Sequence, residues 1–297
     1  MELIELKSAT SRCTVEPEAG GRLLRLEARD VGGRWRPLLV APYDPDQALR
    51  EPTRWGAFPM VPWPNRIARA QFPFDGKTYH VPANSDANAI HGVGFDRPWR
   101  IEAADDRSAV LSLDFDDRWP FGGGARHTVR LLDDGVALTL EVFAGDRAFP
   151  AGAGWHPWFR RDVSDDAPVS VRVDADEIYE LAAMIPTGAL VPVAGETDLR
   201  SQPDLGDRRL DTCYRHPRGP LRVAWGGFAL TMTSSANVTH AVVYTPERAV
   251  CVEPQTCAID AFNLDAGHAF DSGTFVVEPG RPLVVETTWR WAERAAG

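Results

Sequence analysis

Apolar and polar residues alternate with a period of two in several stretches, and this alternation constrains the fold more than any other feature of the chain. In GVALTLEVFA, residues 135–144, the apolar positions 136, 138, 140 and 142 share one face. Residues 169–173 and 283–291 alternate in the same way, whereas no long window shows apolar residues at helical spacing. Side chains of a strand point alternately to its two faces, so these stretches predict antiparallel strands with one buried and one solvated face.

Turn residues separate the strand-like stretches. Gly32-Gly33, Asp75-Gly76 and Asp134-Gly135 each stand between two of them, and residues 277–283 contain another Pro-Gly turn. Glycine tolerates the positive φ of tight hairpins, and Asp before it is nearly as permissive. The sequence therefore predicts an all-β fold, a large antiparallel β-sandwich. No linker or repeat interrupts residues 1–297, so we expect a single domain, with polar loops at 160–168 and 195–209.

Composition excludes several classes of protein. With 297 residues and 44% hydrophobic content, the chain can bury a large core, and its net charge of −10 disfavours nucleic acid and anionic membranes as partners. No apolar stretch approaches the roughly 20 residues of a membrane helix, and the N-terminus lacks the pattern of a secretory signal. Four irregularly spaced cysteines match no zinc pattern or dense disulfide framework. We therefore expect free thiols and a cytoplasmic location.

Two histidines have distinctive surroundings. His91 lies in AIHGVG, where a strand runs into glycines, and His156 lies in GAGWHPWF. Pro157 removes a backbone donor and favours an extended backbone at His156, which predicts a fixed, partly desolvated imidazole. Both could equally be hydrogen-bonded core histidines. The remaining histidines are expected to be structural or exposed: His80, His127, His216, His240 and His268.

Two carboxylates complete the set of candidates. Glu253 ends an apolar stretch in AVCVEPQT, and Asp211 lies in RLDTCY with weaker support. A buried Glu and a buried His can shift each other's pKa toward neutrality, which favours general acid–base catalysis. Together with His91 and His156 they could form a metal cluster, but no short-range ligand spacing supports it. The G-x-S-x-G pattern of a serine hydrolase is absent, and GGGA at 122–125 reads as a turn.

Three of these stretches, in order, resemble motifs of the aldose 1-epimerase (galactose mutarotase) family. PWPNRIARAQFPFDGKTYHVPAN followed by AIHG is similar to the N-R-I…F…G…Y…N…H-G block of the family. GAGWHPWF is similar to its G-x-H-P-Y-F block, and VCVEPQT to its E-P-Q block. The resemblance covers most of the chain. It implies the family fold, a large antiparallel β-sandwich sometimes called a supersandwich, and an isomerase that interconverts the anomers of a sugar.

The resemblance also implies roles for individual residues. His156 would be the general acid and Glu253 the general base, flanking the C1–O5 bond of the sugar. Arg66 and His91 would hold sugar hydroxyls and the region of the ring oxygen. Asp211 would accept hydrogen bonds from hydroxyls, on the shortest of the motifs. No cofactor or metal is needed, because the base takes the proton of the C1 hydroxyl while the acid protonates the ring oxygen.

The environment of His156 decides its protonation. We expect burial between Trp155 and Trp158 to lower its pKa and the charge of Glu253 to raise it, with the charge dominating. The chain also departs from the family pattern at Trp158, where tyrosine is common, and this difference could alter which sugar is preferred.

Other functions and substrates remain open at this point. A non-catalytic carbohydrate-binding protein would need aromatic platforms but not both His156 and Glu253. A glycoside hydrolase or lyase on a similar sandwich could use Glu253 with Asp211 as its two carboxylates. The substrate is expected to be a monosaccharide, which could be neutral, deoxy, phosphorylated or sulfonated. Arginines near the pocket would favour an anionic hexose, and the candidates are Arg69, Arg97, Arg160 and Arg161. The sequence does not predict the oligomeric state.

Overall fold

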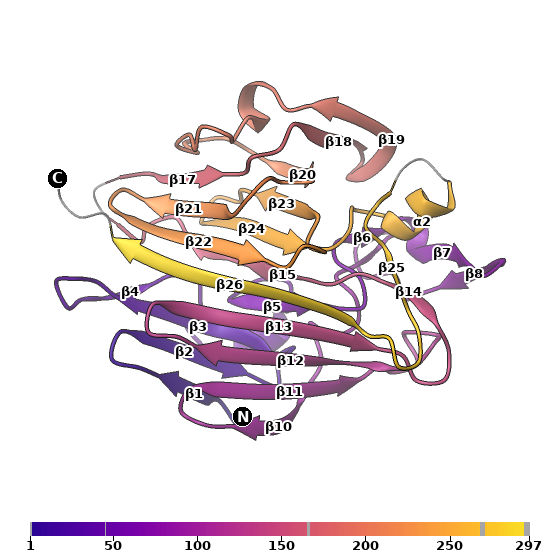
Figure 1. Cartoon of the computed structure of the whole chain (residues 1–297), viewed down its shortest axis with the longest axis horizontal. Coiled ribbons are helices and arrows are strands. Elements are labelled where there is room, and N and C mark those ends of the chain that lie inside the picture. Colours follow the sequence, from indigo (N-terminus) through magenta and orange to yellow (C-terminus); the bar gives the residue numbers. More distant parts are fainter. Residues whose placement is uncertain (1, 45, 165–166, 268–270, 294–297) are drawn as a thin grey trace.

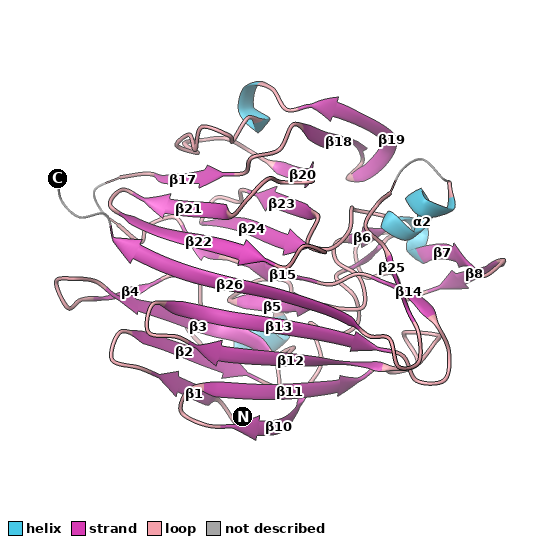
Figure 2. Cartoon of the chain, viewed as in Figure 1, coloured by secondary structure: helices cyan, strands magenta, loops and turns pink. Residues whose placement is uncertain are grey.

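Strands dominate the structure. The computed structural model describes residues 2–44, 46–164, 167–267 and 271–293. Over these residues it has two α-helices, both short, α1 (Asp46–Arg50) and α2 (Ala261–Ala266). Strands and loops make up most of the chain in Figure 2. Single turns of 3₁₀-helix occur at η1 (Ala68–Ala70) and η2 (Gly195–Thr197).

Most strands belong to two large sheets. Among the described residues, the larger sheet has twelve strands. Ten of them follow one another across the sheet: β1 (Ile4–Lys7), β2 (Ser11–Glu16), β3 (Arg22–Arg29), β5 (Ala57–Met60), β15 (Gly154–Pro157), β24 (Ala249–Gln255), β23 (His240–Tyr244), β20 (Asp211–Arg215), β18 (Glu177–Ala182) and β19 (Ile185–Pro192). The other two strands lie outside this order: β4 (Trp35–Pro37) pairs with β3, and β16 (Phe159–Arg160) pairs with β24.

The second sheet has eight strands in the described part of the chain. Their order is β10 (Arg100–Ala104), β11 (Ser108–Asp114), β12 (Gly124–Leu131), β13 (Gly135–Phe143), β26 (Leu283–Glu293), β22 (Phe228–Ser234), β21 (Leu221–Trp225) and β17 (Val169–Arg172). Three small pairs lie outside both sheets: β14 (Phe149–Ala151) with β25 (Phe275–Val277), β6 (Arg66–Ile67) with β9 (Ala89–Ile90), and β7 (Gln71–Phe74) with β8 (Lys77–His80). Neighbouring strands are antiparallel in every one of these sheets.

The two large sheets pack face to face, as the alternation in sequence predicts (Figure 1). On β13 and β26 the buried positions alternate with more exposed ones, and Leu140 pairs with Val285 in the register. A hydrogen bond crosses between the layers, where the indole Nε1 of Trp155 on β15 donates to Nε2 of His127 on β12, 3.1 Å away. One hydrophobic cluster contains buried residues of both sheets. The all-β sandwich is therefore confirmed.

The predicted hairpins form. Asp75 and Gly76 both have positive φ, 48° and 71°, and join β7 to β8 with Phe74 paired to Lys77. Gly32-Gly33 lies between β3 and β4, and Asp134 lies between β12 and β13, with Gly135 as the first residue of β13. Residues 277–283 contain a local turn. The predicted turn at 122–125 is shorter than expected, because β12 already begins at residue 124.

The two predicted loops differ in outcome. Residues 195–209 contain η2 and turns but no strand. The stretch 160–168 is only partly a loop: Arg160 belongs to β16, Val163 is buried, and residues 165–166 lie outside the described residues. β16 is only two residues long, so it is too short to show an alternating pattern, and the polar composition of the stretch predicted a loop instead.

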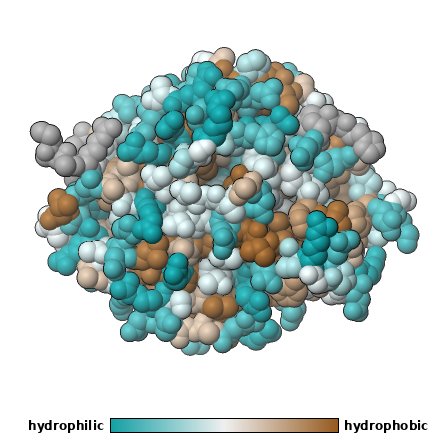
Figure 3. All heavy atoms as spheres, in the orientation of Figure 1, coloured by the Kyte–Doolittle hydropathy of each residue, from teal (hydrophilic) through white to brown (hydrophobic). Residues whose placement is uncertain are grey.

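The surface carries few large hydrophobic side chains. On the face drawn in Figure 3, hydrophobic atoms form small patches among hydrophilic ones. The exposed large hydrophobic residues are Val31, Tyr43, Leu49, Val276 and Val284. In the described segments, no helix is long and apolar enough to cross a membrane. All four cysteines are buried and unpaired, as predicted for free thiols.

Candidate active site

One cavity of about 340 Å³ brings together all five residues that the sequence analysis selected. Its lining includes Arg66, His91, His156, Asp211 and Glu253. These residues come from β6, the end of β9, β15, β20 and β24, which are far apart in the chain. The structure therefore places Asp211, the residue with the weakest motif, in the same cavity as the other four.

The cavity lies on the face of the larger sheet that points away from the second sheet. Trp155 points between the sheets, so its neighbour His156 points to the opposite face. Gly154 pairs with Gln255 in the register of β15 and β24, and this register puts His156 directly opposite Glu253. Nε2 of His156 lies 3.4 Å from Oε1 of Glu253. Acid and base candidates are thus cross-strand neighbours, side by side.

Gly154 allows the two strands to approach closely. A Cβ atom at this position would lie 2.6 Å from the backbone oxygen of Pro254 and 2.8 Å from Cβ of Gln255, both closer than ordinary contacts. The glycine before Trp155 in GAGWHPWF therefore has a packing reason, because it brings β15 against β24 and so His156 against Glu253.

His156 is held between two aromatic rings. Phe58, its neighbour on β5, stacks on it with ring centroids 4.8 Å apart and planes 25° apart. Trp158 stacks on it with centroids 5.4 Å apart and planes 11° apart. The expectation that Trp155 flanks His156 is wrong, because alternation along β15 sends Trp155 into the space between the sheets.

His91 follows β9 in a left-handed backbone conformation, with φ of 64°. The backbone N–H of His91 donates to the backbone oxygen of Asn65, 2.9 Å away. The next residue, Gly92, has φ of 78°, and a Cβ there would lie 1.9 Å from the backbone oxygen of Val61. Only glycine fits at such an approach. The His-Gly pair of AIHG thus fixes the imidazole of His91 edge-on to His156, with centroids 5.0 Å apart.

Arg66 and Asp211 line the cavity as oppositely charged groups. Nη1 of Arg66 donates to Oδ1 of Asn65, 3.2 Å away, and this carboxamide also accepts the Arg66 backbone N–H at 2.9 Å. Asp211 pairs with Tyr244 in the register of β20 and β23, and Tyr244 lines the same cavity. Burial raises the pKa of Asp211, and the charge of Arg66 partly opposes that rise.

Burial controls the protonation of the pair. It lowers the pKa of His156 to about 3, and the positive charges of Arg22 and Arg66 act in the same direction. It also raises the pKa of Glu253 well above its usual range, with the nearby charge of Asp211 adding to the rise and Arg66 opposing it. The expectation that the charge of Glu253 dominates over burial at His156 is wrong for the free protein, because burial is the largest cause and lowers the pKa of His156.

Four buried polar atoms of the lining residues have no hydrogen-bond partner in the described part of the chain. They are Nδ1 of His91, Nδ1 of His156, Nε1 of Trp158 and Oε2 of Glu253. Leaving a buried polar atom unpaired costs about 1–3 kcal/mol. Donors and acceptors left open within one small cavity suit a polar ligand such as a sugar.

Sequence reasoning missed several lining residues. Two lie inside the quoted motif, Asn65 and Asn84. Oδ1 of Asn84 accepts the N–H of Ile90 at 2.7 Å and thereby fixes the strand just before His91. Tyr244 is the last residue of an ordinary apolar strand, β23, so no local pattern indicated it. The further missed residues of the lining are Thr53, Arg54, Ser85 and Ile90, whereas Trp158, which also lines the cavity, had been singled out from the sequence.

Arg22 fixes the segment that carries Thr53 and Arg54. Its guanidinium is buried and donates to the backbone oxygens of Pro52, Arg54 and Trp55 on that segment, at 2.8 to 3.2 Å. It also lies 5.4 Å from the centre of the Phe58 ring that stacks on His156. One buried cation thus supports both the rim of the cavity and the stack behind His156.

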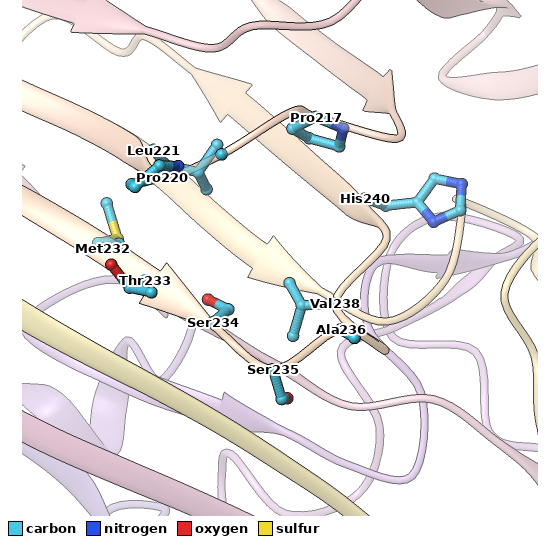
Figure 4. Close-up of a pocket in the computed structure, with 11 residues that line it drawn as sticks. Pro217, Pro220, Leu221, Met232, Thr233, Ser234, Ser235, Ala236, Val238 and His240 are labelled. Atoms are coloured by element: carbon cyan, nitrogen blue, oxygen red, sulfur yellow. The ribbon is translucent and has the colours of Figure 1, made fainter.

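A separate cavity of about 240 Å³ lies between β21, β22 and β23 (Figure 4). Apart from His240, the labelled side chains around it are apolar or carry hydroxyls, so this cavity offers no acid–base pair. Nε2 of His240 lies 2.9 Å from the hydroxyl of Tyr179, and Nδ1 lies 2.9 Å from Oγ1 of Thr239. His240 is therefore a hydrogen-bonded core histidine, as expected.

The remaining histidines agree with their predicted roles where they are described. His127 is buried with both ring nitrogens engaged, by Gly21 and Trp155. His80 and His216 are exposed, and His268 lies outside the described residues. Across the described segments, no group of three or more His, Cys, Asp or Glu side chains is arranged to hold a metal ion.

The four candidate arginines divide into two groups. Arg69 and Arg97 do not line the cavity, and Arg97 pairs with Asp116. Arg160 and Arg161 line an adjoining cavity that shares a wall with it.

Comparison with known proteins supplies the family. A family model described as aldose 1-epimerase matches residues 2–289. YihR, an uncharacterized protein of Escherichia coli (strain K12), is 25% identical over 240 residues, which cover 76% of each chain. The galactose mutarotase of Homo sapiens is 28% identical over 203 residues, which cover 65% of this chain and 58% of that protein.

Solved structures share the fold over nearly the whole chain. A putative aldose 1-epimerase from Escherichia coli K12 superposes with a TM-score of 0.85 at 20% identity, covering 98% of this chain and 99% of that one. A GalM/aldose epimerase homologue from C. elegans superposes with a TM-score of 0.86 at 21% identity, covering 99% of each chain. With the family model matching nearly the whole chain, this protein belongs to the aldose 1-epimerase family.

Proposed function

We propose that this protein is a mutarotase, an isomerase that interconverts the α and β anomers of an aldose by opening and closing its ring. The observation that carries the proposal is the contact between His156 and Glu253, whose Nε2 and Oε1 atoms lie 3.4 Å apart in a buried, polar cavity. Membership of the aldose 1-epimerase family supports a sugar as the substrate.

The reaction needs one proton to arrive and one to leave at atoms bonded to the same carbon. The base takes the proton of the C1 hydroxyl, the acid protonates the ring oxygen O5, and the C1–O5 bond breaks to give the open aldehyde. Rotation about C1–C2 presents the other face of the aldehyde, and closure returns both protons with the roles reversed. Since O1 and O5 are both bonded to C1, an acid and a base that lie side by side, as His156 and Glu253 do, can serve both.

The pair works with one proton between its two members. In the free protein burial favours the uncharged arrangement, with that proton on Glu253. A bound sugar brings hydroxyl groups against the unpaired Oε2 of Glu253, and such hydrogen bonds stabilise a carboxylate. The proton then passes to His156, which becomes the acid that faces O5, while Glu253 becomes the base that faces the C1 hydroxyl.

The other lining residues position the sugar. Arg66 presents donors to ring and hydroxyl oxygens, and Asp211 presents an acceptor to hydroxyl groups. His91, held edge-on to His156, offers its unpaired Nδ1 to the ligand. All chemical steps are carried by side chains, so we expect no cofactor or metal. Four buried free thiols favour a reducing compartment, and we propose the cytoplasm.

A glycoside hydrolase is the second candidate, because two carboxylates, Asp211 and Glu253, line the same cavity. In that reaction His156 would have no role, although its Nε2 lies 3.4 Å from Oε1 of Glu253. A carbohydrate-binding protein would need neither the acid nor the base.

Polarimetry of freshly dissolved α-aldoses distinguishes the three. We expect the protein to accelerate the change in optical rotation of at least one neutral or anionic hexose, with or without a chelator, and to release no reducing ends from glycosides. Release of reducing ends would establish the hydrolase. Sugar binding by calorimetry without any acceleration would establish the binding protein and overturn the proposed activity.

A further inference from the structure

A second, larger cavity adjoins the candidate active site. It has a volume of about 880 Å³ and shares Arg54, Trp158 and Tyr244 with the site cavity. Its other walls come from residues 40–41, from β16 with the residues that follow it, and from residues 246–249, which lead into β24. The space is larger than the site cavity, and the three shared residues place the two cavities side by side.

The charge of this second cavity contrasts with that of the chain. Four arginines line it against two carboxylates, Asp162 and Glu247, in a protein with a net charge of −10. Arg160 pairs with Asp162 at 2.7 Å, whereas Arg161 and Arg248 form no ion pair within the described residues. A concave surface with an excess of positive charge attracts anions.

Unpaired donors add a second, independent observation. Four buried N–H groups of the lining residues have no acceptor in the described part of the chain: Nε of Arg160, Nη2 of Arg161, and Nε1 of Trp55 and of Trp158. All four are donors, and no buried acceptor among the described lining residues is left unpaired. Unpaired donors without unpaired acceptors indicate a ligand rich in acceptor atoms.

The backbone fixes the guanidinium of Arg161. Its Nε donates to the oxygens of Pro246 and Ala249 at 3.2 and 3.0 Å, and its Nη1 donates to the oxygen of Gly206 at 3.1 Å. Only Nη2 is left without an acceptor in the described segments. Burial lowers the pKa of Arg161, and the nearby positive charge of Arg209 adds to that effect. A bound oxyanion would offset both.

The shared wall relates this cavity to the reacting atoms. Trp158 stacks on His156, and in the proposed mechanism His156 faces the ring oxygen O5. C5 is bonded to O5 and carries C6 outside the ring. The C6 substituent therefore leaves the ring on the side of His156, next to Trp158 and the second cavity.

We propose that the second cavity, lined by Arg160, Arg161 and Arg248, is a subsite for an oxyanion carried on C6, so that the preferred substrate is an anionic hexose. This proposal rests on the proposed mutarotase activity for the position of the ring, but the subsite can be tested without turnover. The shared chemistry is a tetrahedral or planar oxyanion, which arginine recognises through several N–H donors at once.

The direct test is calorimetric binding of an unreactive pair of sugars. 1,5-Anhydroglucitol 6-phosphate and 1,5-anhydroglucitol both lack the C1 hydroxyl and cannot react. We expect the phosphate to bind roughly tenfold or more tightly than the neutral compound, because hydrogen bonds from arginine to a charged oxyanion are stronger than those to a neutral hydroxyl. The difference should shrink as salt is added.

Variants connect that preference to the cavity. Arg248→Gln, alone or with Arg160→Gln, should reduce the affinity ratio of phosphate to neutral compound toward one. Arg130→Gln removes one exposed positive charge on β12, in the other sheet, and should leave the ratio unchanged. Thermal melting of each variant checks that it is folded. Arg248 is exposed, so the single variant Arg248→Gln should fold and can be tested alone if the double variant does not fold.

Kinetics identify the oxyanion. The kcat/KM values for mutarotation of glucose 6-phosphate, glucuronate and a hexose 6-sulfonate, each relative to glucose, show which anion the cavity prefers. Equal affinity for the neutral and anionic analogues, or a preference that survives in the double variant, would overturn the subsite. Tight binding of the phosphate without mutarotation of any sugar would uphold the subsite and overturn the proposed function.

Discussion

At the scale of single residues, the candidate site depends on how one proton is shared by two buried side chains. His156 lies against Glu253, between the rings of Phe58 and Trp158, and is nearly inaccessible to solvent. Burial disfavours the charged form of both members: it lowers the pKa of His156 and raises that of Glu253. The sugar itself then completes the environment in which the pair can ionise.

Replacing the base tests this arrangement. Glu253→Gln keeps the shape of the side chain but cannot accept a proton, so we expect the fold and sugar binding to persist while kcat falls roughly 10²-fold or more. Polarimetry measures kcat and calorimetry measures binding. Glu278→Gln, at an exposed position, is the matched control and should retain full activity. More than a tenth of the wild-type kcat in Glu253→Gln would rule out Glu253 as the base.

The pH profile should reflect the shifted pKa values. The working form carries one proton on the pair, and it is lost when a second proton binds to His156, whose pKa is lowered to about 3. Activity should therefore persist well below pH 6.5 and decline only as the pH approaches about 4 to 3. On the alkaline side, activity falls when the pair loses its single proton, at a pH set by the raised pKa of Glu253.

The measurement is kcat/KM against pH for wild type and for His156→Asn, corrected for the spontaneous reaction. The variant should lose the acid limb together with most of the rate. An acid limb near pH 6 in the wild-type protein would show that the imidazole of His156 is not desolvated in the working enzyme. Macroscopic limbs belong to the pair rather than to one residue, so the comparison with the variant is essential.

At the scale of elements, the approach of β15 to β24 positions the chemistry. Gly154→Ala would place a Cβ 2.6 Å from the oxygen of Pro254, and neither backbone can yield without separating the strands. We expect a loss of about 1–3 kcal/mol in the free energy of unfolding, as for other overpacked sites. His156 lies two residues along the same strand, so separating the strands would move it away from Glu253. We expect kcat to fall at least tenfold, because a misplacement of about 1 Å between catalytic groups can have such an effect.

Gly227→Ala is the matched control. It lies in the turn between β21 and β22, and a Cβ there would meet nothing within 4 Å. Urea unfolding and polarimetry on both variants separate packing at the β15–β24 contact from a general effect of replacing glycine. Equal stability and activity in the two variants would show that the close approach does not position the pair.

At the scale of the whole molecule, one hydrophobic cluster joins the two sheets. We therefore propose that the chain unfolds as one cooperative unit, in agreement with the single domain predicted for residues 1–297. Far-UV circular dichroism reports on both sheets, while fluorescence reports on tryptophans such as Trp155 and Trp289, one in each sheet. The two urea transitions should coincide. Two separated transitions would indicate two units and contradict the single domain.

The sequence alone determined the class of fold, and it selected five candidate site residues that line one cavity in the structure. Alternation along a strand and the φ preferences of Asp-Gly and Gly-Gly are local properties, so β13, β26 and the hairpin at residues 75–76 could be predicted without a structure. The motifs around His91, His156 and Glu253 likewise occupy short, continuous stretches. The long separation between these stretches did not prevent their selection, because each carries its own glycine or proline.

Only the tertiary structure decided how these residues act together. The register that sets His156 opposite Glu253, and the position of Arg160 and Arg161 beside the site, depend on strands that are remote in sequence. The pKa of His156 depends on everything packed around it, and burial lowers it although the sequence predicted that the neighbouring charge would dominate. Tyr244 entered the site through strand pairing alone. Strand pairing and burial depend on residues that are remote in the sequence, so no local sequence pattern could have predicted them.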